Sequence, residues 1–297
     1  VSGNSSEIIS GNNTLTVVGA NTETYKGNRT ITISGNLSEL ITGNRTHTVT
    51  GNNYETVKGN RIVLISGNLT ETVKSNNSLD IVGNSTEIYR IDRKLTTDGH
   101  LKETVLGDSS LVIQGNFNED CLGHRTVKIS GPFTETISGR HNITVMNVSQ
   151  ETYKGNRVVT ISGNLKETIS GATTTQYFNT YDLTVEGDNT STYKADRTLV
   201  ISGNLKETVS GNRTLTVSGN NIEQYEVNRT IIVSGNSTET VTGTRLLHVS
   251  GHNTETYLGN RTVNVKANLL ETISGLSSCI ISGTRTLIVS GNNTEIY

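Results

Sequence analysis

The chain has 297 residues, of which 32% are hydrophobic and 18% charged, and its 25 basic and 27 acidic side chains nearly cancel. Globular domains average about 45–50% apolar residues, so the composition excludes two ordinary compact cores. The balanced charge argues against nucleic acid or an anionic membrane surface as the main partner. No apolar run approaches the roughly 18–20 residues that span a bilayer, and no signal peptide is recognisable.

Glycine recurs every eight residues from Gly3 to Gly291, and all 30 glycines fall in this register. With glycine as position one, position two is mostly Asn, position four often Thr or Ser, and position seven Val, Ile or Tyr. β-branched residues favour strands, and Gly-Asn tolerates positive φ in a sharp bend. Each octad is therefore predicted to form one short strand and one corner. The corner glycines include Gly27, Gly35, Gly59, Gly163, Gly211 and Gly219.

Strand alternation places positions three, five and seven on one face, with the reliably apolar position seven deepest. The predicted core therefore includes Val17, Tyr25, Ile33, Val57, Ile65, Ile161, Val217 and Val241. A strand with one dependable core residue cannot bury enough surface alone, so many strands must stack. This pattern predicts an all-β solenoid or prism.

A second period of sixteen residues is superimposed, because position five alternates between Glu and an apolar residue. The alternation slips around residues 171–178 and 275–290, and no 24-residue unit is evident. With three octads per coil, Glu-type and apolar-type octads would lie side by side on the three faces of every level. Three identical chains about a threefold axis instead place three copies of the same octad at each level. The pattern therefore favours a homotrimeric, intertwined, triple-stranded parallel β-helix. Residues 1–297 would form a single octad-repeat shaft.

Rod length separates this architecture from its alternative. One octad per face and level gives about 37 levels and a rod of about 180 Å, at about 4.8 Å per strand. A single-chain solenoid with three octads per coil would reach only about 60 Å.

Charged side chains predict how neighbouring octads align. In the trimer, Glu at position five lies diagonally near Arg at position three of the next octad, within reach of long side chains. We expect interchain pairs Glu23–Arg29, Glu39–Arg45, Glu55–Arg61, Glu239–Arg245 and Glu255–Arg261. Exposed pairs contribute about 0–1 kcal/mol each, so the ladder would set register more than stability. The alternative is a set of solvated charges that prevents aggregation.

Other side chains give weaker signals. Most position-seven tyrosines follow Glu by two residues, so Glu either accepts the phenol hydrogen bond or the ring merely fills space. His47 is inward, and three copies would meet near the axis as a weak metal or anion site, although a packed histidine is the preferred interpretation. Cys121 and Cys279 lie too far apart for a disulfide and are expected to be buried free thiols. No Ser-His-Asp arrangement or phosphate loop is present, so we expect neither enzyme activity nor a cofactor.

Residues 28–35, 55–60 and 212–219 (Asn-Arg-Thr-Ile-Thr-Ile-Ser-Gly, Glu-Thr-Val-Lys-Gly-Asn, Asn-Arg-Thr-Leu-Thr-Val-Ser-Gly) resemble the valine–glycine octad shaft of contractile-injection spikes. These are the central spike of contractile-tailed phages and the VgrG spike of type VI secretion. The resemblance covers essentially the whole chain. It implies a trimeric shaft that transmits force and helps puncture the target envelope, which it contacts only transiently. It also implies a baseplate or tube hub at one end, a tip protein at the other, and a place at the virion tail tip or secretion-apparatus tip, extracellular on delivery.

Departures from that family leave alternatives open. No hub, lysozyme domain or His-x-His tip motif is recognisable, and the chain begins and ends at position seven, so we expect a fragment of a longer shaft. The alternatives are a trimeric fibre or adhesin shaft that spaces a receptor-binding tip, and a single-chain solenoid that serves as a binding module. Outward Thr at positions four and six is interrupted too often to favour an ice-binding face.

Overall fold

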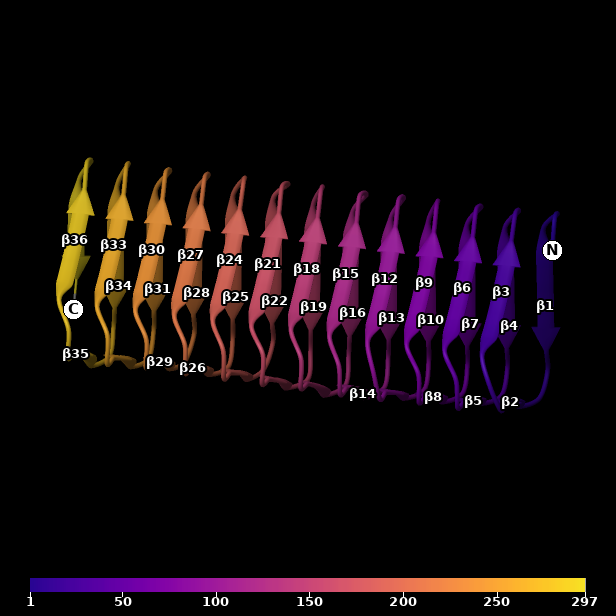
Figure 1. Ribbon diagram of the computed structural model, residues 1–297. Coiled ribbons are helices and arrows are strands. Elements are labelled where there is room, and N and C mark those ends of the chain that lie inside the picture. The colour runs from indigo at the N-terminus through magenta and orange to yellow at the C-terminus, as the bar shows by residue number, and fades with distance from the viewer. Residues whose placement is uncertain (297) are drawn as a thin grey trace. The chain divides into compact units, whose positions relative to one another are not determined.

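The computed structural model describes residues 1–296, and the position-seven residue Tyr297 lies outside them. The chain divides into two compact units, Val1–Asn147 and Val148–Tyr297, which are described separately. Each octad forms one strand over positions three to seven, and positions eight, one and two form the corner (Figure 1). The strands have five residues, except for β37, of which four are described. The fold is therefore the all-β parallel solenoid that the octad predicts.

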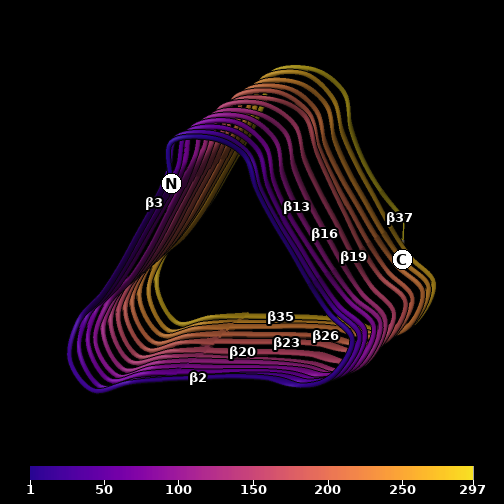
Figure 2. The ribbon, with the colours of Figure 1, turned by 90° about the vertical axis from the view of Figure 1, so that its right-hand side faces the viewer.

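The first unit contains three parallel sheets of six strands, one on each face of a triangular coil (Figure 2). Its first sheet comprises β1 (Ser5–Ile9), β4 (Arg29–Ile33), β7 (Asn53–Val57), β10 (Asn77–Ile81), β13 (Leu101–Val105) and β16 (Arg125–Ile129). Its second sheet comprises β2 (Asn13–Val17), β5 (Leu37–Ile41), β8 (Arg61–Ile65), β11 (Ser85–Tyr89), β14 (Ser109–Ile113) and β17 (Phe133–Ile137). Its third sheet comprises β3 (Asn21–Tyr25), β6 (Arg45–Val49), β9 (Leu69–Val73), β12 (Arg93–Thr97), β15 (Phe117–Cys121) and β18 (His141–Val145).

The second unit repeats this plan. Its first sheet comprises β19 (Ser149–Tyr153), β22 (Thr173–Tyr177), β25 (Arg197–Ile201), β28 (Asn221–Tyr225), β31 (Arg245–Val249), β34 (Leu269–Ile273) and β37 (Asn293–Ile296). Its second sheet comprises β20 (Arg157–Ile161), β23 (Tyr181–Val185), β26 (Leu205–Val209), β29 (Arg229–Val233), β32 (Asn253–Tyr257) and β35 (Ser277–Ile281). Its third sheet comprises β21 (Leu165–Ile169), β24 (Asn189–Tyr193), β27 (Arg213–Val217), β30 (Ser237–Val241), β33 (Arg261–Val265) and β36 (Arg285–Val289).

Strand pairing follows a 24-residue coil. Ile31 lies opposite Glu55, and Ile33 lies opposite Val57, in a parallel register that recurs through both units. Within each unit a strand therefore pairs with the strand three octads further along the chain, a spacing that the sequence pattern alone did not indicate. Pairing of consecutive octads from different chains stays a prediction.

The sixteen-residue alternation survives inside the 24-residue coil. Glu55 lies between Ile31 of the preceding coil and Leu79 of the next. Because three is an odd number, a step of three octads exchanges Glu for an apolar residue just as a step of one octad does. Our expectation that the alternation conflicts with three octads per coil is therefore wrong. The alternation alone does not discriminate between one chain and three.

Position seven forms the innermost apolar layer. The side chains of Ile33, Val57, Ile65, Ile161, Val217 and Val241 are fully buried. Val17 and Tyr25 are only half-buried, because they lie in the first coil and are covered from one side. Positions three and five also point inward, so the interior contains buried Arg and Glu side chains as well as apolar ones.

The corner glycines are required by close stacking. Among the described residues only Gly19 has positive φ (117°), so our expectation of left-handed corners is wrong. A Cβ added to Gly59 would lie 2.6 Å from the carbonyl oxygen of Gly35, one coil earlier. The other predicted corner glycines stack in the same way: Gly27 on Gly3, Gly35 on Gly11, Gly187 on Gly163, Gly211 on Gly187 and Gly219 on Ala195.

Asparagine at position two builds a second ladder along each corner. The N–H of Asn60 donates to Oδ1 of Asn36 at 2.8 Å, and the N–H of Asn84 donates to Oδ1 of Asn60 at 2.9 Å. Asp92 accepts in the same way from the N–H of Asn116 at 2.7 Å. Gly-Asn is therefore selected for stacking and for this hydrogen bond, which satisfies backbone donors that the strands leave free.

The two cysteines differ in environment. Both are free thiols, and Cys121 is buried, but Cys279 is exposed. Our expectation of two buried thiols is therefore wrong for Cys279. Its strand, β35, is the last of its sheet, so no later strand covers position five.

Candidate functional site

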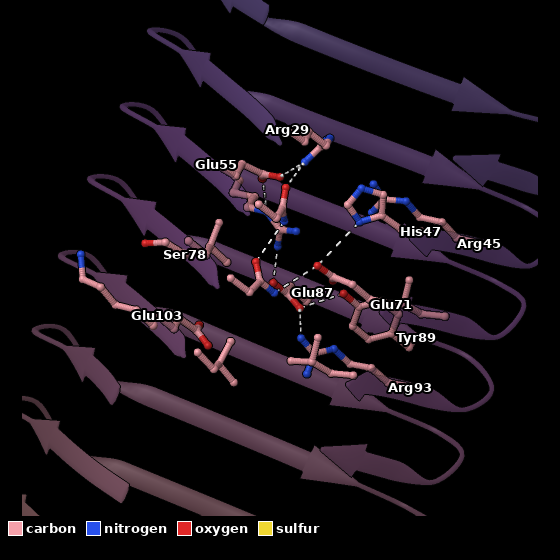
Figure 3. A pocket seen from close by; sticks show the side chains of 18 residues that line it. Arg29, Arg45, His47, Glu55, Glu71, Ser78, Glu87, Tyr89, Arg93 and Glu103 are labelled. Atoms are coloured by element: carbon pink, nitrogen blue, oxygen red, sulfur yellow. Dashed lines mark hydrogen bonds and ion pairs between the residues drawn. The ribbon is translucent and has the colours of Figure 1, made fainter. Parts of the chain in front are cut away.

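The interior of the first unit holds a network of charged side chains around a polar cavity of about 50 Å³ (Figure 3). Arg61, Glu87, Tyr89, Arg93 and Glu103 are among the residues that line it. They come from β8, β11, β12 and β13, whose positions three, five and seven point inward. We call this Arg–Glu network the interior ladder.

Arg61 of the interior ladder bridges two glutamates. Nε of Arg61 in β8 donates to Oε1 of Glu55 at 3.0 Å, six residues earlier on the preceding face. Nη1 of Arg61 pairs with Glu87 of β11, 26 residues later on the next coil of the same sheet. The ladder therefore advances by one coil and one face at each step.

The same steps extend the ladder in both directions. Nη1 of Arg29 lies 3.7 Å from Oε2 of Glu55, and Nη2 of Arg93 lies 3.7 Å from Oε2 of Glu87. Glu55 and Glu87 thus each contact two arginines. Alternating charges bring each of these side chains close to an opposite charge, which a buried ion needs to offset its lost hydration.

The second unit carries an equivalent ladder. Arg245, which is 1% exposed, donates through Nε to Oε1 of Glu239 at 2.7 Å and pairs through Nη1 with Glu271. Glu255 pairs with Arg229 and with Nη2 of Arg261, the latter at 3.0 Å.

Burial and pairing have opposite effects on the glutamate pKa values. Burial alone would raise the pKa of Glu55, but Arg61 and Arg29 hold it below its ordinary value. Burial opposes ionisation of Glu255 as well, and Arg229 and Arg261 again hold its pKa below the ordinary value. These carboxyls are therefore ionised at neutral pH inside the prism.

The structure brings four of the five predicted pairs together. Glu39–Arg45 (3.0 Å), Glu55–Arg61 (3.0 Å), Glu239–Arg245 (2.7 Å) and Glu255–Arg261 (3.0 Å) are ion pairs within one chain. Glu23 and Arg29 do not come within ion-pair distance among the described residues; Glu23 instead accepts a hydrogen bond from Asn21 at 3.2 Å. The expectation that the pairs are exposed is wrong, because positions three and five line the interior. The alternative of solvated charges fails for the same reason.

Position-seven tyrosines join the ladder through their hydroxyl groups. The hydroxyl of Tyr89 donates to Oε2 of Glu87 at 2.8 Å, and that of Tyr225 donates to Oε2 of Glu223 at 3.1 Å. Burial and the adjacent carboxylate raise the pKa values of both phenols above the ordinary value. The tyrosines therefore stay neutral and act as hydrogen-bond donors.

His47 is buried in β6, and its Nδ1 lies 3.7 Å from Oε1 of Glu71. Burial opposes ionisation of Glu71, but His47 and Arg45 hold the pKa of Glu71 below its ordinary value. One copy of His47 thus serves as a partner of a ladder carboxylate. Among residues 1–296 no group of three or more His, Cys, Asp or Glu side chains is arranged to hold a metal ion.

An aromatic cluster in the second unit escaped the sequence analysis. The rings of Tyr153, Tyr177 and Tyr181 stack with centroid separations of 5.3 and 4.4 Å, and Arg157 lies over Tyr153 and Tyr181 at 4.9 and 5.0 Å. Tyr181 occupies position three, where Arg, Leu or a small polar residue is usual. This departure from the repeat is the feature of the sequence that could have indicated the cluster. It coincides with the slip in the sixteen-residue alternation.

The ladder is interrupted at Glu103 in β13. Its partner positions, 26 residues earlier and six residues later, hold Asn77 and Ser109 in place of arginine. The carboxylate makes no hydrogen bond or ion pair among the described residues. Burial and the carboxylate of Glu87 raise the pKa of Glu103 to about 7. Glu103 is thus a half-buried carboxyl that forms no ion pair with an arginine of the same chain among the described residues.

No helix among the described residues is long and apolar enough to cross a membrane. Among known protein families, the family described as the Gp5 C-terminal repeat matches in three copies, over residues 203–221. No curated protein and no solved structure matches the chain. The matched segment contains β26 and β27, and Arg213 of β27 pairs with Glu207 of β26 at 3.0 Å. Residues 203–221 therefore match the repeat of a phage-tail spike, which agrees with the resemblance found in the sequence, and the octad of this segment recurs along the rest of the chain.

Proposed function

We propose that this chain is the shaft of a spike in a contractile injection machine, where it transmits axial force and helps puncture the target envelope. The match to the Gp5 C-terminal repeat carries this proposal. Closed faces of parallel strands support it, because each unit is a prism without free lateral sheet edges. A core cross-linked by buried ion pairs resists sliding of one coil over the next.

We further propose that three copies wind together. In such a winding the hydrogen-bonded neighbours of an octad are the preceding and following octads of other copies. Every position-five Glu from Glu23 to Glu271 then has an Arg at position three of the octad before or after it. In the chain closed on itself, the preceding strand β10 offers Asn77 to Glu103, the following strand β16 offers Arg125, and Glu103 makes no ion pair with an arginine among the described residues. Because an unpaired buried charge costs several kcal/mol, this complementarity supports three-chain winding.

Particle length and mass test the three-chain proposal together. Electron microscopy is expected to show rods of about 180 Å, at about 4.8 Å per level. Native mass spectrometry is expected to give three times the chain mass of 32.0 kDa. Rods near 60 Å with the mass of one chain would contradict the proposal.

The role in an injection machine is tested in producing cells. An epitope-tagged chain should co-purify with contractile particles, and gold-labelled antibody should mark the end of the tube, where a hub and a tip protein are the expected neighbours. Particles from cells that lack the chain provide the control. Label along lateral fibres would favour the fibre-shaft alternative, and absence from all particles would contradict both.

A second candidate, a single-chain binding module, is favoured by one observation. The third sheet of each unit presents outward columns of threonine: Thr46 lies opposite Thr70 and Thr48 opposite Thr72, and Thr190 and Thr214 pair likewise in the second unit. The 24-residue coil gathers on one face threonines that seem scattered in the sequence. Regularly spaced threonine hydroxyls can form hydrogen bonds with an ordered layer of water. This candidate function therefore predicts a monomer that adsorbs to ice. Loss of adsorption in T70K/T72K but not in T30K/T32K, on the first sheet, would support it.

A further inference from the structure

Two charged residues on successive strands of the first unit lack adequate partners and line the same cavity (Figure 3). One is Glu103 of β13, whose ladder positions hold Asn77 and Ser109. The other is Arg93 of β12. Its Nε is buried without a hydrogen-bond partner, and its only ion pair among the described residues is the 3.7 Å contact with Glu87.

Arg93 is held mainly by aromatic rings. Its guanidinium lies 4.8 Å from the ring centroid of Phe117 and 5.5 Å from that of Tyr89. Such contacts stabilise the cation but do not satisfy Nε–H. The self-closed chain therefore leaves one buried donor and one half-buried carboxyl that line the same cavity without a hydrogen-bond partner among the described residues.

The charged groups around Glu103 do not compensate for its burial. Glu87 and Glu119 oppose its ionisation, whereas Arg93 and Arg125 favour it more weakly than burial opposes it. The strands beside it place Leu79 of β10 and Val127 of β16 directly opposite. Together these effects raise the pKa of Glu103 to about 7.

Three-chain winding changes this neighbourhood. The strand before β13 on the same face becomes the β12 octad of a second copy, which brings position three of that octad diagonally beside position five of β13. Position three of β12 is Arg93. We propose that Arg93 of a second copy completes the site at Glu103, so that this pair selects the intertwined assembly over the self-closed coil once the carboxyl ionises. The inference rests on the three-chain shaft proposed above.

The pH dependence follows from the direction of the shift. In the self-closed chain the pKa of Glu103 lies above the ordinary 4.5, so this form has its full stability below about pH 4.5 and loses it as the pH rises to about 7. In the three-chain form the paired carboxylate contributes stability above the ordinary pKa. The balance therefore moves toward the trimer between about pH 4.5 and 7.

Refolding of the full chain tests the inference. The chain is unfolded in denaturant, refolded at one concentration at pH 5 and at pH 8, and its mass is measured by light scattering. The ratio of trimer to monomer should rise at least about tenfold for the wild type, since one pKa unit corresponds to a tenfold change. Glu103→Gln should abolish the rise, whereas Glu55→Gln, at a carboxylate that already has two arginines, should retain it.

A second variant keeps the acid and supplies its partner within the chain. Ser109→Arg places an arginine six residues after Glu103, as Arg61 follows Glu55, so it should also abolish the pH dependence. Trimers at both pH values, equally in wild type and Glu103→Gln, would overturn the inference and leave the three-chain shaft intact. Monomers of every variant at both pH values would overturn the three-chain shaft, and the inference with it.

Discussion

Glu103 and Glu255 occupy the same position of the octad and face the same kind of interior, but their electrostatic environments are opposite. Glu255 in the second unit pairs with Arg229 and Arg261 and accepts the hydroxyl of Tyr257 at 3.1 Å. Its pKa lies below the ordinary value, whereas that of Glu103 rises to about 7. Burial alone would raise the pKa of both carboxyls.

This difference shows that partner positions determine whether an interior glutamate is charged. The residues six positions after and 26 positions before each carboxyl decide the outcome in the self-closed chain. Where both are arginine, the ladder continues, and where both are small polar residues, it stops.

The largest effect is expected from breaking an intact part of the ladder. Arg245→Met leaves Glu239 and Glu271 without their shared arginine in the interior. Removal of one member of a buried ion pair costs about 3–5 kcal/mol, and urea titration of the free energy of unfolding measures it. Arg285→Met, at an exposed arginine in β36, is the control and should change stability by less than about 0.5 kcal/mol. Equal effects at both sites would contradict the ladder.

The pH dependence of the unfolding free energy distinguishes Glu103 from Glu255. In the self-closed chain, ionisation of Glu103 should cost about 3 kcal/mol between pH 4.5 and 7, because its pKa rises from 4.5 to about 7 and each unit corresponds to about 1.4 kcal/mol. The unfolding free energy of the wild type minus that of Glu103→Gln, followed against pH, isolates this effect. Glu255 should behave in the opposite sense, because its contribution is lost as the pH falls below 4.5. A flat difference for Glu103 would show that it has a cationic partner.

Adding a single methyl group to a stacked corner glycine should lower the stability of the fold. Gly59→Ala places Cβ 2.6 Å from the carbonyl oxygen of Gly35, so the coils must separate, at a cost of about 1–3 kcal/mol. Gly11→Ala has open space around Cβ and serves as the control, with little or no effect on thermal stability. If both variants melt alike, the corners do not depend on close stacking.

The smallest effect concerns the asparagine ladder. Asn36→Ala removes the acceptor of the Asn60 N–H and should cost about 1 kcal/mol. Asn36→Asp keeps the acceptor, as Asp92 does naturally, and should retain most of the stability. Loss of hydrogen-exchange protection at the amide of Asn60 in the alanine variant alone would locate the effect.

Local features of this fold could be predicted from the sequence because they depend on short spacings. Alternation within a strand places Ile33 and Val57 inward, and the six-residue spacing of Glu39 and Arg45 brings them together across a corner. The spacing holds because consecutive octads occupy adjacent faces. None of these features requires knowledge of the neighbouring coil.

Features that depend on the neighbouring coil could not be predicted. The Arg61–Glu87 pair requires a spacing of 26 residues, which becomes visible only when a coil closes after three octads. The role of Gly59 was misassigned because a tight corner and a tight stack select the same residue. The cluster of Arg157 with Tyr153, Tyr177 and Tyr181 likewise forms only when residues 24 positions apart are placed side by side.

Co-refolding tests most directly how many chains share one prism. Equal amounts of a chain with a long tag and a chain with a short tag are unfolded together, refolded at pH 8 and separated by native electrophoresis. Three-chain winding predicts four species in a ratio of about 1:3:3:1, and none of the mixed species when prisms folded separately are mixed afterwards. Two species, each with the mass of a single chain, would contradict the account.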